Sequence, residues 1–440
     1  MDIENDRKII QNITRLLYIS ILISPFLPPV VMLLIGILTV FYQKKNGLNS
    51  FQYLPDRIFL GFILLSILGW LIEPHLVMGI PTMLLPVFFY GLYYLLSIWI
   101  RDVVDWSWQD IQKMYMFFWI CGVFIAVVVI LQRVDWEVIN QSPPLRYILD
   151  FYSYFRWQAN YSERSVGTSG NSNLAAALLI CLALLSIFAL SVLKNMRQKI
   201  GAFAIFIVFC IAIMCTGSRG AWGGLVIGLI VQLWMTGHRK RTVVISLSIL
   251  GSVFLFPQLI PRKDTLASTL DDRLVVWSTA FDIFKENWIL GTLPLRFGEL
   301  AEQAGVKVFH AHNIFLGIAT EYGVIGLFLF LALILSTIYR ARRWRKTANK
   351  KEEKRLAGML ISQTIAILGH GMYDYPIIAP QIGVLFILSI IIIHTQYEKR
   401  CVKRPAWSEG DDIPKEATLL QALSSFIVSA KVNIKSFRSK

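Results

Sequence analysis

The chain has 440 residues, of which 55% are hydrophobic and only 16% are charged. Soluble domains carry about a quarter charged residues, so a chain with a mean hydropathy of +0.58 has too much apolar surface for a water-soluble fold. The net charge of +15 does not indicate a nucleic-acid partner, because the basic residues lie in short loops beside apolar segments. The composition predicts an integral membrane protein.

Apolar segments of about 20 residues, long enough to cross a bilayer as helices, recur along the whole chain. Pro25, Pro28 and Pro29 favour a tight turn between the first two segments over one long kinked helix. The expected spans are 9–25, 27–43, 57–73, 79–99, 111–132, 173–193, 200–216, 221–236, 242–260, 313–338, 356–373 and 376–395. We therefore expect an all-α polytopic bundle of about twelve transmembrane helices, forming one membrane domain over residues 1–410.

The distribution of lysine and arginine predicts how this bundle is oriented. With twelve spans the two termini share one side, and that side holds 32 of the 43 basic residues. Loops rich in lysine and arginine stay in the cytoplasm. Both termini are therefore expected to be cytoplasmic.

Two loops on the opposite, extracytoplasmic side are long enough to carry a function: 133–172 and 261–312. The second contains an amphipathic segment at 273–288, which is typical of a helix that lies on a membrane surface. Residues 411–440 form a second amphipathic and basic segment. We expect this tail to rest on the anionic cytoplasmic leaflet.

The first motif that could carry chemistry is TGSRGAWGG at 216–224, between two expected spans. An arginine at the edge of a membrane is costly without a partner, and flanking glycines let backbone N–H groups approach an anion. Arg219 and Ser218 are therefore candidates for an anion site. The alternative is an arginine that extends its charge to the surface from a tight turn between closely packed helices.

The second motif is DDR at 271–273. Arg273 opens the amphipathic segment, and Asp271 and Asp272 suit the start of a helix. Taken alone, a surface ion pair explains these side chains better than a binding site does. Arg273 is still a candidate for a binding site, because it is expected on the same side of the membrane as Arg219.

The third motif is FHAHN at 309–313, followed by an apolar helix that carries Glu321. Histidine exchanges a proton near neutral pH, as a general base requires. The spacing of His310 and His312 could also hold a metal ion, but the sequence offers no evident third ligand, and the five cysteines show no metal-ligand or disulfide spacing. We expect neither a metal ion nor another cofactor.

His370 lies in GHGMYDY at 369–375, near the outer end of a later span and beside an acid. It could line the same cavity as the other motifs. A histidine hydrogen-bonded within the helical bundle is the interpretation that we favour.

Two arginines and a histidine on one membrane face suggest a reaction. Arginine binds phosphate through two parallel hydrogen bonds and keeps its charge, so Arg219 and Arg273 could hold a diphosphate and stabilise the charge that grows as it departs. His312 or His310 could take the proton of an incoming hydroxyl. The residues therefore suggest that an acceptor alcohol displaces a lipid diphosphate.

These residues resemble the bacterial O-antigen ligase and O-antigen polymerase (Wzy-type) superfamily, over about 165–395. The most specific match is His312-Asn313, then nine residues, then Gly323-Val324-Ile325-Gly326. The TGSRG turn and the Arg273-x-x-x-Trp277 pattern also resemble the family. Gly170-Asn171-Ser172-Asn173 resembles an Asn-Pro-Asn signature of related members, with Ser172 in place of the proline.

The resemblance implies a metal-independent, inverting glycosyltransferase of the GT-C-like type in a bacterial inner (plasma) membrane. Its donor would be a glycan on undecaprenyl diphosphate, bound by Arg219 and Arg273. His312 would activate a hydroxyl of the acceptor, which is lipid A core in lipopolysaccharide biosynthesis by a ligase and another lipid-linked glycan for a polysaccharide polymerase. Further candidates to line the substrate site are Arg164, Asn171, Asn173, Ser218, Arg296, His310, Asn313, Glu321 and His370.

Two alternatives stay open beside the ligase. A polymerase shares the donor chemistry and the histidine motif. A transporter of the inorganic-carbon type has a similar number of spans, although the sequence shows no inverted repeat with paired broken helices.

Overall fold

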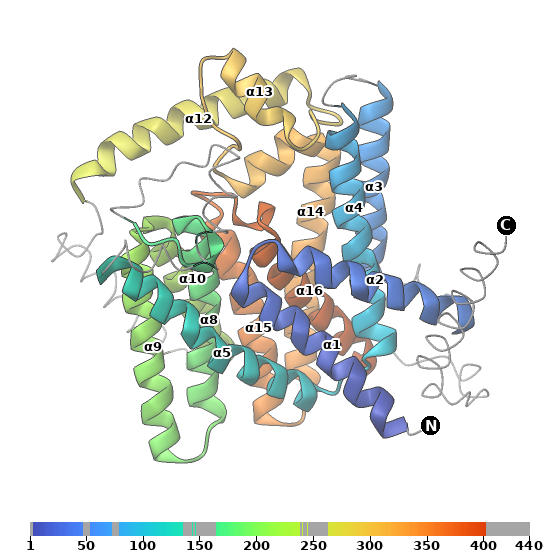
Figure 1. The fold of residues 1–440 in the computed structure, drawn as a ribbon, viewed down its shortest axis with the longest axis vertical. Helices are drawn as coiled ribbons and strands as arrows, with labels where there is room; N and C mark the ends of the chain where they lie inside the picture. Colours follow the sequence, from blue (N-terminus) through green and yellow to red (C-terminus); the bar gives the residue numbers. More distant parts are fainter. Residues whose placement is uncertain are drawn as a thin grey trace.

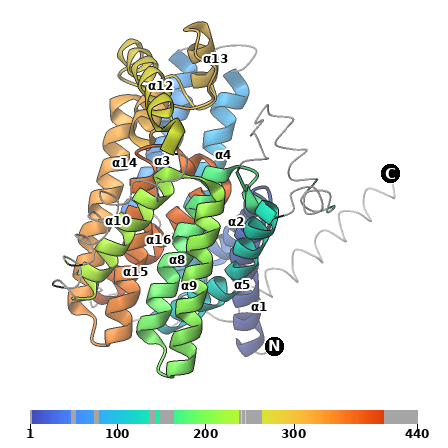
Figure 2. The same ribbon diagram turned by 90° about the vertical axis from the view of Figure 1, so that its left-hand side faces the viewer.

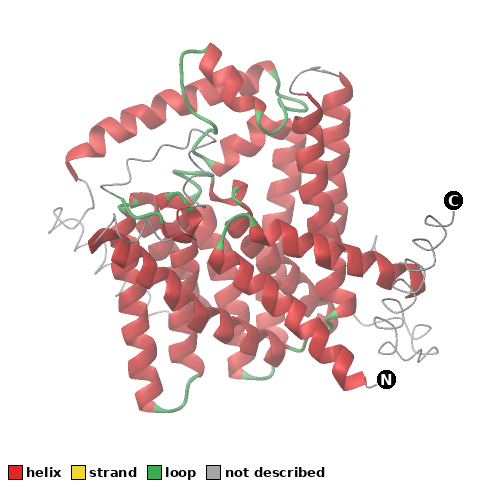
Figure 3. Ribbon diagram, in the orientation of Figure 1, coloured by secondary structure: helices red, strands yellow, loops and turns green. Residues whose placement is uncertain are grey.

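The computed structural model describes residues 3–46, 53–72, 79–134, 164–237 and 263–401, with single residues at 143, 146, 240 and 244. Within these ranges every regular element is a helix (Figure 3). Most of the helices form a bundle, and two others, α12 and α13, lie over one end of it (Figures 1 and 2). The expected all-α class is confirmed.

The N-terminal part of the bundle contains α1 (Ile3–Ile23), α2 (Leu27–Asn46), α3 (Leu54–Ile72), α4 (Gly79–Ile98), a π-helical turn at Trp99–Val103 and α5 (Trp108–Val134). The predicted turn between the first two spans is confirmed, since α1 ends at Ile23 and α2 begins at Leu27. Pro28 and Pro29 occupy the first turn of α2, where a missing N–H costs no helical hydrogen bond.

The C-terminal part contains α8 (Ser172–Val192), α9 (Met196–Thr216), α10 (Arg219–Met235), α14 (Ile314–Thr347), α15 (Lys351–His370) and α16 (Pro380–Cys401). Burial ranks these helices from centre to edge. In the most apolar windows of α16 and α8, 89% and 78% of the residues are buried, against 28% for α9. α16 and α8 are therefore central, while α9 presents most of its surface outward.

Eight of the described helices are long and apolar enough to cross a membrane, which confirms a polytopic membrane protein. Helices also occupy the expected spans at α1, α10 and α15, although α10 is shorter. The expected span 242–260 lies outside the described residues except for Val244, as do the tail at 411–440 and most of the loop at 133–172. The number twelve stays a prediction.

We call the end of the bundle next to α12 and α13 the loop end. α12 (Leu266–Glu286) runs across this end and α13 (Arg296–Gln303) lies beside it (Figure 1). A small core of Ala280, Ile283, Phe297, Ala301 and Ala311 joins both helices to the chain before α14. Because Ala311 separates His310 from His312, this core also fixes the histidine motif.

The expected start of the amphipathic helix is wrong. α12 begins at Leu266, so Arg273 lies inside the helix and does not open it. Leu266, Leu270 and Leu274 extend the apolar four-residue spacing toward the N-terminus. Asp271 and Asp272 are consequently ordinary exposed positions of the helix, not its cap.

α14 is broken at Gly323, where φ is 64° and ψ is −167°. The backbone groups freed by the break bond to the chain that follows α12. Thr292 N donates to Thr320 O over 2.8 Å, Leu293 N to Glu321 O over 2.9 Å, and Val324 N to Trp288 O over 2.8 Å. The loop is therefore fixed to the helix by main-chain hydrogen bonds, and we call this contact the α14 clamp.

A Gly323→Ala substitution tests the clamp. A Cβ at this position would lie 2.1 Å from Ile289 O, and φ is in the left-handed region. Strain of this kind costs about 1–3 kcal/mol, and the clash with the main chain adds to it, so we expect a clearly lower unfolding temperature in detergent. Gly201→Ala is the matched control, because its Cβ would meet nothing within 4 Å. Equal unfolding temperatures for the two variants would contradict the clamp.

The opposite end of the bundle is held by buried ion pairs. Arg400 donates to both oxygens of Glu353, over 2.8 and 2.5 Å, and Trp344 Nε1 donates to Glu353 Oε1 over 2.9 Å. This network joins α14, α15 and α16. Arg101 similarly contacts the fully buried Asp56 over 2.6 Å and so joins the π-helical turn after α4 to α3. α15, which ends at the cavity with His370, is thus fixed to α14 and α16 at the end opposite the cavity.

Candidate active site

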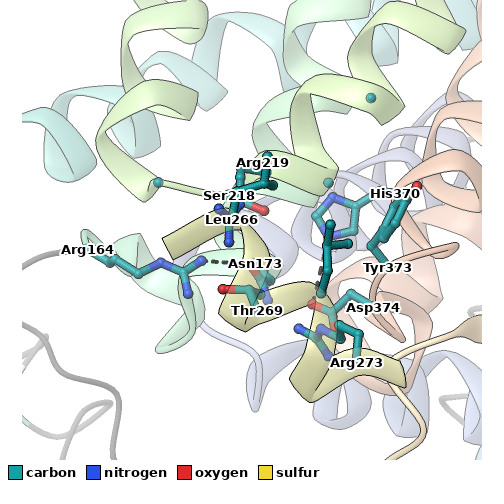
Figure 4. A pocket seen from close by; sticks show the side chains of 14 residues that line it. Arg164, Asn173, Ser218, Arg219, Leu266, Thr269, Arg273, His370, Tyr373 and Asp374 are labelled. Atoms are coloured by element: carbon teal, nitrogen blue, oxygen red, sulfur yellow. Dashed lines mark hydrogen bonds and ion pairs between the residues drawn. The ribbon is translucent and has the colours of Figure 1, made fainter. Parts of the chain in front are cut away.

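A cavity of about 390 Å³ lies at the loop end, where α8, α10 and α15 meet α12 (Figure 4). Several helix termini meet there: α8 and α10 begin, α9 and α15 end. Fourteen residues line it, namely Arg164, Asn173, Gly217, Ser218, Arg219, Gly220, Gly223, Leu266, Thr269, Leu270, Arg273, His370, Tyr373 and Asp374. The lining is strongly basic, with three arginines against one carboxylate.

Two of the arginines lie on the side of the cavity that is formed by the starts of α8 and α10. Arg164 donates to Thr216 O over 2.9 Å and to the side chain of Asn173 over 2.7 Å. Arg219 is the first residue of α10 and donates to Thr265 O over 3.3 Å. Since no side chain caps the N-terminus of α10, its first N–H groups add positive potential at the same wall.

The third arginine, Arg273, reaches the cavity from α12. Its Nη1 is buried and has no hydrogen-bond partner. Burial lowers the pKa of the guanidinium, Asp374 and Asp272 raise it, and the charge of Arg219 lowers it further. The surface ion pair considered from the sequence therefore does not describe Arg273, which presents a buried donor to the cavity.

His312 lies next to this cavity and is paired with Asp374. His312 Nδ1 is 3.1 Å from Asp374 Oδ1, and 24% of the His312 side chain is exposed. Its φ of 48° is unusual for a residue other than glycine, and strain of this kind concentrates at functional sites. Trp277, one turn after Arg273 in α12, donates from Nε1 to His312 O over 3.3 Å. α12 thus contacts the histidine motif directly.

Asp374 is an acceptor throughout the neutral range. Burial alone would raise the pKa of its carboxyl, but neighbouring histidines and Arg273 hold that pKa well below its usual value. A carboxylate at 3.1 Å fixes the proton of His312 on Nδ1 and leaves the lone pair on Nε2. This is the arrangement of a histidine that accepts a proton.

His310 sits against His312, with ring centroids 4.2 Å apart. Its Nδ1 accepts a hydrogen bond from His312 N over 3.2 Å, and its Nε2 lies 3.9 Å from Asp374 Oδ1. Burial lowers the pKa of His310, Asp374 raises it, and Arg273 lowers it. His310 is therefore neutral, and its Nδ1 orients the backbone of His312.

The expectation that the histidines lack a third metal ligand is wrong. Ligand atoms of His310, His312 and Asp374 lie within 4.8 Å of one another, as in a metal site. Arg273 places its charge beside the same carboxylate, which opposes a divalent cation. Metal independence stays a prediction, tested below.

His370 is not hydrogen-bonded within the bundle, contrary to expectation. It is 1% exposed, neither ring nitrogen has a hydrogen-bond partner, and it lines the cavity. Nε2 lies 3.8 Å from Asp374 Oδ2, the oxygen that does not contact His312. Asp374 therefore stands between two histidines.

Two asparagines expected to line the site act instead as helix caps. Asn313 Oδ1 accepts from the N–H groups of Phe315 and Leu316, and its Nδ2 donates to Met372 O over 3.1 Å. It thereby starts α14 and holds it to the segment that carries Asp374. Asn171 caps α8 in the same way. Neither lines the cavity, whereas Ser218, at the start of α10, does.

Two other candidates lie apart from this cavity. Glu321 faces a second cavity of about 140 Å³, rich in aromatic side chains from α3, α4, α14 and α16, where it accepts a hydrogen bond from Tyr375 Oη over 2.9 Å. Arg296 is half-buried at the start of α13 and lines neither cavity. The structure thus brings together Arg164, Asn173, Ser218, Arg219, Arg273, His310, His312 and His370.

Residues 202–331 match the family model described as O-antigen ligase (Wzy_C). The resemblance to the O-antigen ligase and polymerase superfamily is confirmed. A search of the curated proteins finds no match. The O-antigen ligase segment contains Arg219, Arg273 and His312, whereas His370 and Asp374 follow it in the chain.

The match supports a role for the chain as a membrane-bound enzyme of the ligase or polymerase type, with lipid-linked glycan and acceptor substrates. Sequence reasoning singled out most of the residues at the cavity but passed over Asp374 as a site residue. The available signal was the acid four residues after His370 in GHGMYDY, which the sequence already placed beside that histidine.

Proposed function

We propose that this protein transfers a glycan from a polyprenyl diphosphate to a hydroxyl group of an acceptor, on the extracytoplasmic face of a bacterial inner membrane. The family match supports the general class of activity. The donor, the acceptor and the roles of individual residues are our proposal.

The observation that carries the proposal is a basic cavity directly beside a histidine–carboxylate pair. Arg164, Arg219 and Arg273 line the cavity, and Asp374 belongs both to its lining and to the pair with His312. The unpartnered Nη1 of Arg273 offers a hydrogen bond to an anion. A diphosphate supplies the negative charge and the several acceptor oxygens that such a cavity requires.

His312 acts as the general base of the reaction. Nε2 takes the proton of the acceptor hydroxyl as its oxygen attacks the anomeric carbon of the donor sugar. The bond from that carbon to the diphosphate breaks, and its electron pair leaves on the diphosphate. Asp374 stabilises the imidazolium that forms, and attack from the face opposite the diphosphate inverts the anomeric carbon.

The arginines stabilise the departing diphosphate. Its negative charge grows as the bond breaks, so cationic donors fixed around it bind the transition state more tightly than the ground state. Arg219 and Arg273 lie close enough for the charge of one to lower the pKa of the other. An anion between them relieves this repulsion, and a metal ion is not required for charge compensation.

The orientation follows from the basic residues. The loop between α14 and α15, at the end opposite the cavity, follows the arginine-rich stretch RARRWRK at 340–346. Because such segments remain cytoplasmic, the cavity would face the periplasmic side. Donor lipids presented from the outer leaflet would then reach it.

Deletion of the gene tests the function in the cell. We expect loss of surface-linked polysaccharide, with free lipid A core and accumulated lipid-linked polymer if the protein is a ligase. Chains of a single repeat would identify a polymerase instead. Unchanged surface glycans, together with uptake of a small ion by vesicles that contain the purified protein, would overturn the proposal in favour of a transporter.

A further inference from the structure

His370 is the feature at the cavity that the reaction above does not use. It is the last residue of α15, and its side chain lies beside Asp374 in the wall of the cavity (Figure 4). At 1% exposure it has no access to bulk water, and neither ring nitrogen has a hydrogen-bond partner. A buried polar group without a partner is destabilising, and a ligand in the cavity would supply the missing partner.

Arg273, on the other side of the cavity, also has a buried nitrogen, Nη1, without a hydrogen-bond partner. Two buried donors without partners, on α12 and α15, therefore face one cavity. A ligand that satisfied both would need at least two acceptor oxygens, and the cationic lining would favour an anion.

The position of His370 is fixed by a close approach of α10 and α15. A Cβ on Gly224 would lie 2.7 Å from Ala366 O and 3.0 Å from His370 Cβ. Only glycine permits this contact, and it sets His370 relative to Arg219 at the start of α10.

Asp374 connects His370 to the base of the reaction. Its Oδ1 lies 3.1 Å from His312 Nδ1, and its Oδ2 lies 3.8 Å from His370 Nε2. One carboxylate thus lies beside two histidines, of which only His370 lines the cavity with the arginines. Neither ring nitrogen of His370 is engaged in a hydrogen bond, so His370 can donate one to a ligand.

We propose that His370 donates a hydrogen bond to the departing diphosphate and is a catalytic residue on the leaving-group side, opposite the base His312. The proposal rests on the proposed function above. The acceptor proton still goes to His312, and the electron pair of the broken bond still leaves on the diphosphate. His370 stabilises that charge without giving up its proton.

The test measures binding of farnesyl diphosphate and farnesyl monophosphate to the purified full-length protein in nanodiscs. We expect His370→Ala and His370→Phe to bind the diphosphate about 10- to 100-fold more weakly than the wild type, as for loss of one charge-assisted hydrogen bond. The monophosphate should be affected less. Phenylalanine fills the space of the imidazole, so weak binding by this variant is not a packing defect.

His394→Ala is the matched control. This histidine is also 1% exposed, but it lies in α16, contacts Thr337 over 3.0 Å and does not line the cavity. We expect its diphosphate affinity to equal that of the wild type. His312→Ala should also bind the diphosphate within about twofold of the wild type while losing transfer, because His312 acts on the acceptor.

The outcomes separate the two proposals. If the wild type transfers glycan and binds the diphosphate, but His370→Phe binds it equally well, the role of His370 is overturned and the proposed function stands. If the wild type neither binds the diphosphate nor transfers glycan, the proposed function fails as well. Weak binding by both His370 variants, with normal binding by His394→Ala, supports the role.

Discussion

Replacement of His312 by alanine is expected to lower the rate of glycan transfer by about 10²- to 10⁴-fold, the usual contribution of a general base. Asp374 Oδ1 lies 3.1 Å from Nδ1 of this histidine and accepts its proton in a hydrogen bond. The basic Nε2 therefore points away from Asp374. His310 does not take over this role, since it already uses its Nδ1 to accept from His312 N. The measurement is a transfer assay with purified protein, a lipid-diphosphate glycan and an acceptor.

His394→Ala controls for loss of a buried histidine elsewhere in the bundle. Unfolding temperatures should show that both variants are folded. Transfer by His312→Ala at the rate of the wild type would exclude His312 as the base, and the pair with Asp374 would then be purely structural.

Replacement of Arg273 by alanine is expected to lower kcat/KM by about 10²- to 10³-fold, comparable with loss of one donor that stabilises a developing charge. Its buried Nη1 faces the cavity without a partner. Arg273→Lys should recover only part of the activity, because an ammonium group cannot form the two parallel hydrogen bonds of a guanidinium. Arg296→Ala, on the same loop but outside both cavities, removes an equal charge as the control.

The same assay tests metal independence. If arginines compensate the diphosphate, a chelator should leave the wild-type rate unchanged, and added Mg²⁺ should not rescue Arg273→Ala. Loss of activity on chelation, with recovery on addition of Mg²⁺, would contradict the arginine mechanism. It would assign His310, His312 and Asp374 to a metal ion instead.

Local sequence signals predicted the helices well because hydropathy and proline act locally. The turn before Leu27 and the start of α8 near residue 172 follow from such signals. The start of α12 did not, because Asp271 and Asp272 look like a helix cap although they are also compatible with a helix interior. The apolar spacing of Leu266, Leu270 and Leu274 distinguishes the two, but it was outweighed by the cap-like pair of acids.

The site was predictable in its residue types but not in its pairings. Asp374 follows His312 by 62 positions, and their contact depends on how α15 docks against α14. The lack of hydrogen-bond partners for the ring nitrogens of His370 also results from how the helices pack. Gly224 brings α10 so close to α15 that no other side chain fits between them. Glu321 was misplaced for the same reason, because a helix position does not reveal which cavity its side chain meets.

The α14 clamp has a consequence for how the substrate range of this protein can change. The bonds from the loop to Thr320, Glu321 and Val324 are all between main-chain atoms, so they do not depend on which side chains the loop carries. Glycine is required at 323 in the helix and at 291 in the loop, where a Cβ would lie 2.4 Å from Tyr322 N. The other loop residues can therefore vary, and with them the surface of the loop, while Arg273 and His312 keep their relative positions. For the proposed function, this means that glycan specificity and catalytic geometry are free to evolve separately.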